Sequence, residues 1–180
     1  MCKPPQPVPH PGRADQRSVP ERAIPTPSDH PGGDTVTQAT LSAAAQASLA
    51  IWHRMIATHS MADLDSIVAD EVVFHSPVAH TPYPGRVALR MVLESVNQVF
   101  QDFRYHRTFV SDDGRSVVLE FSALVDGKSV KAIDMIRFND AGKIDDFEVM
   151  VRPKSGLDAL AAAMGARLAS QKSVLQGASA

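Results

Sequence analysis

The sequence predicts an α+β domain in which helices cover one face of a curved antiparallel sheet. From Thr35 to about residue 100, apolar residues recur mainly at the three- and four-residue spacing of helices. After that point the period changes to two, and dipeptides that favour tight turns separate the alternating segments. Helices followed by a run of strands are typical of α+β proteins, because strands joined by tight turns pair in antiparallel order.

Four helical segments are expected from this spacing. In the first, residues 41–56 keep one apolar side, and Thr37 or Thr40 can provide the N-cap. The others are expected in a short stretch after Ser60 or Asp63, at residues 86–100 and, following Ser155, at residues 157–168.

Five strands are expected. The first is residues 71–75, and the segment from His75 to Gly85 is expected to be an irregular loop because three prolines interrupt it. The other four are expected at residues 103–111, 116–125, 129–139 and 143–152. The turns between these four contain Asp113-Gly114, Asp126-Gly127 and residues 139–142, so the strands should form an antiparallel meander.

Composition limits the classes of function. The net charge of −2 gives no electrostatic footprint for nucleic acid, and no apolar run is long enough to span a membrane. Cys2 is the single cysteine, so no internal disulfide can form, and no apolar segment of a secretory signal follows Lys3. We therefore expect a cytoplasmic protein that binds neither nucleic acid nor membranes.

The chain divides by composition into a tail and one domain. Residues 1–34 hold nine of the thirteen prolines and almost no large apolar side chains, which predicts a disordered tail. A passive extension and a proline-rich docking segment for a partner are both compatible with it. The domain is expected at residues 35–170, followed by a disordered C-terminus at residues 171–180.

Asp134 is the most informative polar residue, because it lies in the middle of the strand at residues 129–139. Alternation of side chains places it on the same face as Val130, Ala132, Ile136 and Phe138. The turn at Asp126-Gly127 puts Leu119 opposite Asp134, and a loop at residues 139–142 puts Phe147 on its other side. A buried ionised carboxylate costs on the order of several kcal/mol unless a partner or a shifted pKa relieves it. Asp134 is therefore either part of a functional site or a structural acid satisfied by a helix N-terminus or by Arg104.

The opposite face of these strands is mixed in character. Glu120 and Glu148 lie in one row on it and could form a catalytic pair of carboxylates. The nearby Lys131, Arg137 and Arg152 instead favour a solvated row or a contact between subunits. The mixed face predicts a homodimer.

Three segments, Val73–Pro77, Ile133–Phe138 and Phe147–Pro153, together with the element order, resemble the SnoaL-like branch of the nuclear transport factor 2-like superfamily. The resemblance covers about residues 36–168. It implies a cone-shaped, cystatin-like roll, in which a strongly curved antiparallel sheet packs on helices and leaves a pocket at its open end. Relatives include polyketide cyclases, ketosteroid isomerases, scytalone dehydratase and limonene epoxide hydrolase, while others only bind ligands, so the fold alone does not select the function.

The resemblance also implies a role for Asp134, because a pocket aspartate on a central strand moves a proton in the enzyme branches. The Asp-Tyr-Asp trio of ketosteroid isomerases and the Asp-Arg-Asp arrangement of limonene epoxide hydrolases cannot be assigned completely here. We expect a cofactor-independent isomerase, cyclase or dehydratase that acts on a small apolar carbonyl or polyketide-like compound, with Asp134 as acid and base. The alternative is a non-catalytic module of the same fold that binds a ligand or dimerises.

The expected pocket combines residues from the sheet and the proline-containing loop. Tyr105 and His106 alternate on their strand, so one of the two points inward and can stabilise an oxyanion. The candidate pocket residues are Phe74, His75, His80, Tyr83, Tyr105, His106, Leu119, Phe121 and Phe147. No metal is expected, because the histidine pairs at 75 and 80 and at 53 and 59 lack a metal-binding spacing.

Overall fold

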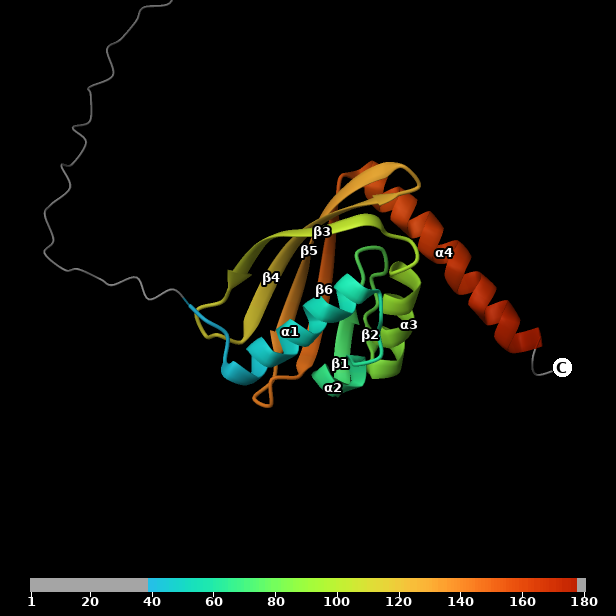
Figure 1. Cartoon of the computed structure of the whole chain (residues 1–180). Coiled ribbons are helices and arrows are strands. Elements are labelled where there is room, and N and C mark those ends of the chain that lie inside the picture. The colour runs from blue at the N-terminus through green and yellow to red at the C-terminus, as the bar shows by residue number, and fades with distance from the viewer. Residues whose placement is uncertain (1–38, 178–180) are drawn as a thin grey trace, which may run out of the picture. The chain divides into compact units, whose positions relative to one another are not determined.

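The computed structural model describes residues 39–177 (Figure 1), so the predicted tail at residues 1–34 lies outside the described residues. The helices are α1 (Ala43–Thr58), α2 (Leu64–Ile67), α3 (Arg86–Val96) and α4 (Lys154–Gly177). The strands are β1 (Val68–His75), β2 (Tyr83–Pro84), β3 (Gln101–Val110), β4 (Ser116–Val125), β5 (Lys128–Phe138) and β6 (Ile144–Arg152). This arrangement confirms the predicted α+β fold class.

The six strands form one curved sheet in the order β2-β1-β6-β5-β4-β3 (Figure 1). Strands β3 to β6 are the predicted antiparallel meander. Two features differ from the prediction. The meander starts at the far edge of the sheet and ends beside β1, so β6 is the neighbour of β1. The two strands pair in parallel, and the sheet is therefore not antiparallel throughout. The loop expected to be irregular contains β2, in which Pro84 is tolerated because β2 is an edge strand.

The register of β4 and β5 agrees with the prediction, and Leu119 lies opposite Asp134. The register of β5 and β6 differs by two residues, so Asp134 lies opposite Val149 and not Phe147. One residue comes from the loop, where Asn139 pairs with Lys143, and one from a bulge between Arg137 and Phe138, where Asp145 is the extra residue in β6. Because side chains alternate with a period of two, this even shift leaves residues 146–152 on their predicted faces, whereas Ile144, before the bulge, lies on the inner face opposite Phe138 and not on the predicted outer one.

The helix ends also differ from the predicted ones. α1 is capped by Ser42, whose Oγ accepts a hydrogen bond from the Ala45 amide at 3.2 Å, and not by Thr37 or Thr40. α3 ends at Val96, four residues early. α4 begins at Lys154 and continues to Gly177, beyond both ends of the helix predicted at residues 157–168.

The helices lie against the inner face of the sheet and bury its apolar side chains. Trp52 of α1 packs edge-on against Phe147 of β6, with ring centroids 5.3 Å apart. The start of α4 lies so close to β5 that a Cβ on Gly156 would be 2.6 Å from a methyl carbon of Val130. α4 therefore packs against strands β4, β5 and β6 and against α3.

No helix in the described part of the chain is long and apolar enough to cross a bilayer.

Candidate active site

Asp134 lies on the inner face of β5 and is 5% exposed. The Tyr105 hydroxyl donates a hydrogen bond to Asp134 Oδ2 at 2.7 Å. The same hydroxyl accepts a hydrogen bond from Trp52 Nε1 at 2.9 Å. The acid is therefore partnered by a tyrosine and not by a helix N-terminus or Arg104. The three side chains form a chain of hydrogen bonds from α1 across β3 to β5.

Strand β3 pairs with β4 irregularly on both sides of Tyr105. Tyr105 lies opposite Phe121 on the inner face, and the register then shifts before Thr108. This bulge places Arg107 on the outer face, where it pairs with Glu120. His106 also points outward and forms a hydrogen bond to Ser122 at 2.7 Å. Of the two alternating candidates, Tyr105 is the inward one.

Burial controls the protonation of this pair. Loss of solvation raises the pKa of Asp134 to about 7, although the hydrogen bond from Tyr105 opposes part of the rise. Burial, together with the negative charge of Asp134, raises the pKa of Tyr105 well above its usual value. Near neutral pH, therefore, Asp134 can gain or lose a proton while Tyr105 remains a donor.

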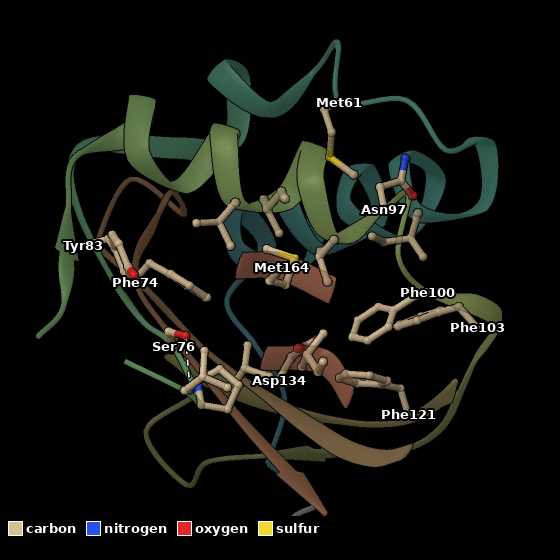
Figure 2. Close-up of a pocket in the computed structure, with 18 of the residues that line it drawn as sticks. Met61, Phe74, Ser76, Tyr83, Asn97, Phe100, Phe103, Phe121, Asp134 and Met164 are labelled. Carbon is tan, nitrogen blue, oxygen red and sulfur yellow. Dashed lines mark hydrogen bonds between the residues drawn. The ribbon is translucent and has the colours of Figure 1, made fainter. Parts of the chain in front are cut away.

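Asp134 and Tyr105 line a cavity of about 120 Å³ between the helices and the inner sheet face (Figure 2). Its walls are largely apolar and aromatic. Phe103 and Phe121 stack beside Tyr105, with ring centroids 4.8 Å apart. Leu160, Met164 and Leu168, four residues apart on α4, close one side. The cavity can hold an apolar molecule in contact with a carboxyl that changes charge near neutral pH.

The structure brings together Asp134 and four of the predicted pocket residues. Phe74, Tyr83, Tyr105 and Phe121 line the cavity. Leu119 and Phe147 are buried in the core but are not part of the cavity wall. They share the inner face with Asp134, but other side chains separate them from the open space.

The three predicted pocket histidines lie outside the cavity. His75 follows the inward-facing Phe74 in β1, so it points outward and forms a hydrogen bond to Asp146 at 3.2 Å. His106 follows Tyr105 in the same way, and His80 is exposed in the loop. These placements correct the sequence-based pocket: strand alternation turns His75 and His106 away from the cavity, and His80 lies in a loop outside the cavity wall.

Several cavity residues were missed by the sequence analysis. Trp52 was interpreted as core, but besides being buried it donates to Tyr105 and lines the cavity. Phe103 could have been found, because it lies two residues before Tyr105 and so shares its face. His59 and Asn97 follow the last residues of α1 and α3, and no sequence pattern places the ends of these two helices together.

Glu120 lies on the outer face and is paired with Arg107 and Lys131, the latter with its Nζ 3.1 Å from Oε1. These contacts, the hydrogen bond from Arg107 above all, lower the pKa of Glu120 to about 2. A carboxylate held in the charged form by two cations is poorly suited to proton transfer near neutral pH.

The family model of the SnoaL-like domain matches residues 49–147, which is more than half of the chain. The chain belongs to the SnoaL-like domain family. The match confirms the resemblance noted in the sequence. A search of the curated proteins finds no match to this SnoaL-like protein.

Solved structures support the same assignment. A steroid delta-isomerase from Pseudomonas aeruginosa is 54% identical over 74% of this chain and 97% of that chain, with a TM-score of 0.72. An uncharacterized bacterial protein with a cystatin-like fold from Silicibacter pomeroyi is 32% identical over 72% of this chain and 90% of that chain, with a TM-score of 0.66. The epoxide hydrolase/cyclase-like enzyme SalBIII, 18% identical over 61% of this chain and 92% of that chain with a TM-score of 0.52, shares the fold.

Proposed function

We propose that this SnoaL-like protein is a cofactor-independent isomerase that moves a proton on a small apolar carbonyl compound, with Asp134 as acid and base. The observation that carries the proposal is a buried carboxyl with a pKa of about 7 in the wall of an apolar cavity. The similar structure described as a steroid delta-isomerase supports a double-bond shift in a polycyclic ketone as the reaction.

The proposed reaction needs one group that takes and returns a proton. Ionised Asp134 removes a proton from the carbon between the carbonyl and the double bond of a β,γ-unsaturated ketone, which leaves a dienolate. The resulting carboxylic acid returns the proton to the γ carbon, which gives the conjugated ketone and regenerates the carboxylate. Tyr105 donates to Asp134 Oδ2 and holds the carboxyl in place during both steps.

The dienolate also needs a donor for its oxygen. Tyr105 is already committed, because its hydroxyl donates to Asp134 and accepts from Trp52. The hydroxyls of Ser76 and Tyr83 line the cavity and are the candidate donors (Figure 2).

The hydroxyl of Tyr105 is already hydrogen-bonded to Asp134 and Trp52, so it does not provide a donor for an oxyanion. This favours a second candidate function, which is ligand binding without catalysis. In that case the carboxyl of Asp134 stays protonated in the complex and donates to the ligand carbonyl. Burial raises the pKa of Asp134, which supports this form as well.

Replacing Asp134 by asparagine separates the two candidates. The Asp134→Asn variant keeps the shape of the side chain and the acceptor for Tyr105 but cannot take a proton. With a β,γ-unsaturated steroid ketone as substrate, we expect a loss of about 10³-fold in turnover, measured by the ultraviolet absorbance of the conjugated product. Ligand affinity, measured by quenching of the fluorescence of Trp52, should change little.

The matched control is Asp145→Asn, which alters a partly exposed acid paired with Arg137 outside the cavity wall. It should keep the turnover of the unmodified protein. Full turnover by Asp134→Asn would overturn the catalytic role, and tight binding with no turnover by the unmodified protein would favour the ligand-binding function.

We also propose that the outer sheet face forms a homodimer. Met150 is 48% exposed there and lies between Glu148 and Arg152 on β6. Neither of these charges has an ion-pair partner within residues 39–177. A two-fold axis near Met150 would bring Arg152 of each copy to Glu148 of the other. Light scattering should report twice the chain mass, and a monomer at micromolar concentration would contradict the proposal.

A further inference from the structure

His59 and Asn97 form a second polar position in the cavity wall, away from Asp134. His59 caps α1 in a left-handed conformation with a φ of 52°, and its amide bonds back to Met55 and Ile56. Asn97 follows the last residue of α3, and its amide bonds to Leu93. Both side chains line the cavity, and Figure 2 shows Asn97 and Asp134 on separate sides of it.

The hydrogen bonds between the two residues define their orientation. Asn97 Nδ2 donates to the His59 carbonyl oxygen at 3.1 Å, and Asn97 Oδ1 lies 3.0 Å from His59 Nδ1. A flipped amide would place its oxygen against the carbonyl oxygen, so this arrangement is the stable one. Because Oδ1 can only accept, Nδ1 carries the proton, and neutral His59 has an unprotonated Nε2.

The pair therefore keeps one unused acceptor and one unused donor. His59 Nε2 has no hydrogen-bond partner within residues 39–177, and the second proton of Asn97 Nδ2 has none there either. An acceptor and a donor side by side match a hydroxyl group, which can donate to one and accept from the other. A carbonyl oxygen would satisfy only the donor.

We infer that His59 and Asn97 are specificity-determining residues that recognise a hydroxyl group at the end of the ligand remote from its carbonyl. The inference rests on the proposed function, because it assigns the carbonyl end of the ligand to Asp134. The apolar walls between the two polar positions match an apolar body of the ligand, and the proposed reaction makes that body a polycyclic ketone. The ligand class is thus an elongated polycyclic ketone with a distal hydroxyl.

The test compares two probes that differ only at the distal position: a 3-oxo-4-ene steroid with a 17β-hydroxyl and its 17-deoxy counterpart. Dissociation constants are measured by quenching of Trp52, the single tryptophan, which lines the cavity. We expect the unmodified protein to bind the hydroxylated probe about fivefold more tightly, as for a hydrogen bond at a partly wet cavity mouth.

Two variants should remove this preference. His59→Asn keeps a residue that tolerates the left-handed conformation but removes Nε2, and Asn97→Ala removes the donor. In both, the affinity ratio of the two probes should fall to about one, while binding of the deoxy probe changes little. The control Gln98→Ala alters a neighbouring exposed amide outside the cavity wall and should keep the preference.

The readout is a ratio, which a purely structural link between α1 and α3 would not change. Equal affinity of the unmodified protein for the two probes would overturn the inference, and so would a preference that both variants retain. Binding of neither probe would overturn it together with the proposed function. Preference without turnover would overturn only the proposed catalysis, and turnover without preference would overturn only this inference.

Discussion

Asp134 and Glu120 are two buried acids on adjacent strands of the same sheet, and their pKa values are shifted in opposite directions. Asp134 is 5% exposed and Glu120 is 6% exposed. Their cross-strand pairs, Leu119 with Asp134 and Glu120 with Ile133, are consecutive in the ladder. The pKa of Asp134 rises to about 7, whereas that of Glu120 falls to about 2. Low exposure alone therefore does not decide whether an acid is charged.

The difference arises from the partners on each face. On the inner face, the helices exclude water, and β3 provides Asp134 with one uncharged donor, Tyr105. On the outer face, Arg107 and Lys131 bring two positive charges to Glu120 while their own side chains remain 64% and 51% exposed. The cations keep much of their hydration and still compensate the carboxylate. The inner acid is thereby available for proton transfer, and the outer acid is not.

The largest expected effect concerns stability and the charge of Asp134. Its pKa is raised in the folded state, so the folded protein binds more protons than the unfolded chain between about pH 4 and pH 7. Stability should therefore fall across this window and level off above it, by an amount on the order of 4 kcal/mol. Asp134→Asn should remove this dependence, so the variant is the more stable protein at pH 8. Urea unfolding at a series of pH values measures it, and parallel curves would contradict the raised pKa.

An intermediate effect is expected for Tyr105→Phe. The substitution removes the hydrogen bond that lowers the pKa of Asp134, so that pKa should rise further. If ionised Asp134 is the base, turnover of the unmodified protein rises through about pH 7, and the rise should move to higher pH in the variant. The loss of an acceptor for Trp52 should also cost about 1–3 kcal/mol. An unchanged pH profile would show that Tyr105 does not affect the proton of Asp134.

The smallest effect is expected for Glu120→Gln. The pKa of Glu120 is lowered in the folded state, so its contribution is complete above about pH 4.5 and is lost as pH falls towards 2. The variant should be slightly less stable at neutral pH, show a flatter loss of stability in acid, and keep its turnover. Added salt should reduce the difference, because the paired cations are exposed. Equal acid sensitivity of the two proteins would contradict the role assigned to the ion pairs.

Much of the sheet could be predicted because its determinants are local. The turn Asp126-Gly127 set the register of β4 and β5 correctly, since both residues adopt the positive φ angles of a two-residue hairpin turn. The loop after Phe138 was harder, because a bulge has no clear sequence signal, and the predicted neighbour of Asp134 was wrong by two residues. The faces of residues 146–152 were still correct, because an even shift preserves alternation.

The cavity could be predicted only in part. Strand alternation placed Phe74, Tyr105 and Phe121 with Asp134, and the proline-containing loop placed Tyr83 there. His75 and His106 were misplaced because they were selected for their chemistry, whereas strand alternation turns both of them outward. The contributions of α1, α3 and α4 depend on how helices cross the sheet, which periodicity does not specify.

The sequence by itself determined that an acid lies in the middle of an apolar strand face, because alternation and the hairpin turn are properties of a few neighbouring residues. Tertiary structure decided what that acid can do. Trp52, Tyr105 and Asp134 are far apart in the chain, and only packing of α1 and β3 against β5 brings them within hydrogen-bonding distance. Packing also excludes the water that would otherwise keep Asp134 charged, so its pKa reaches about 7.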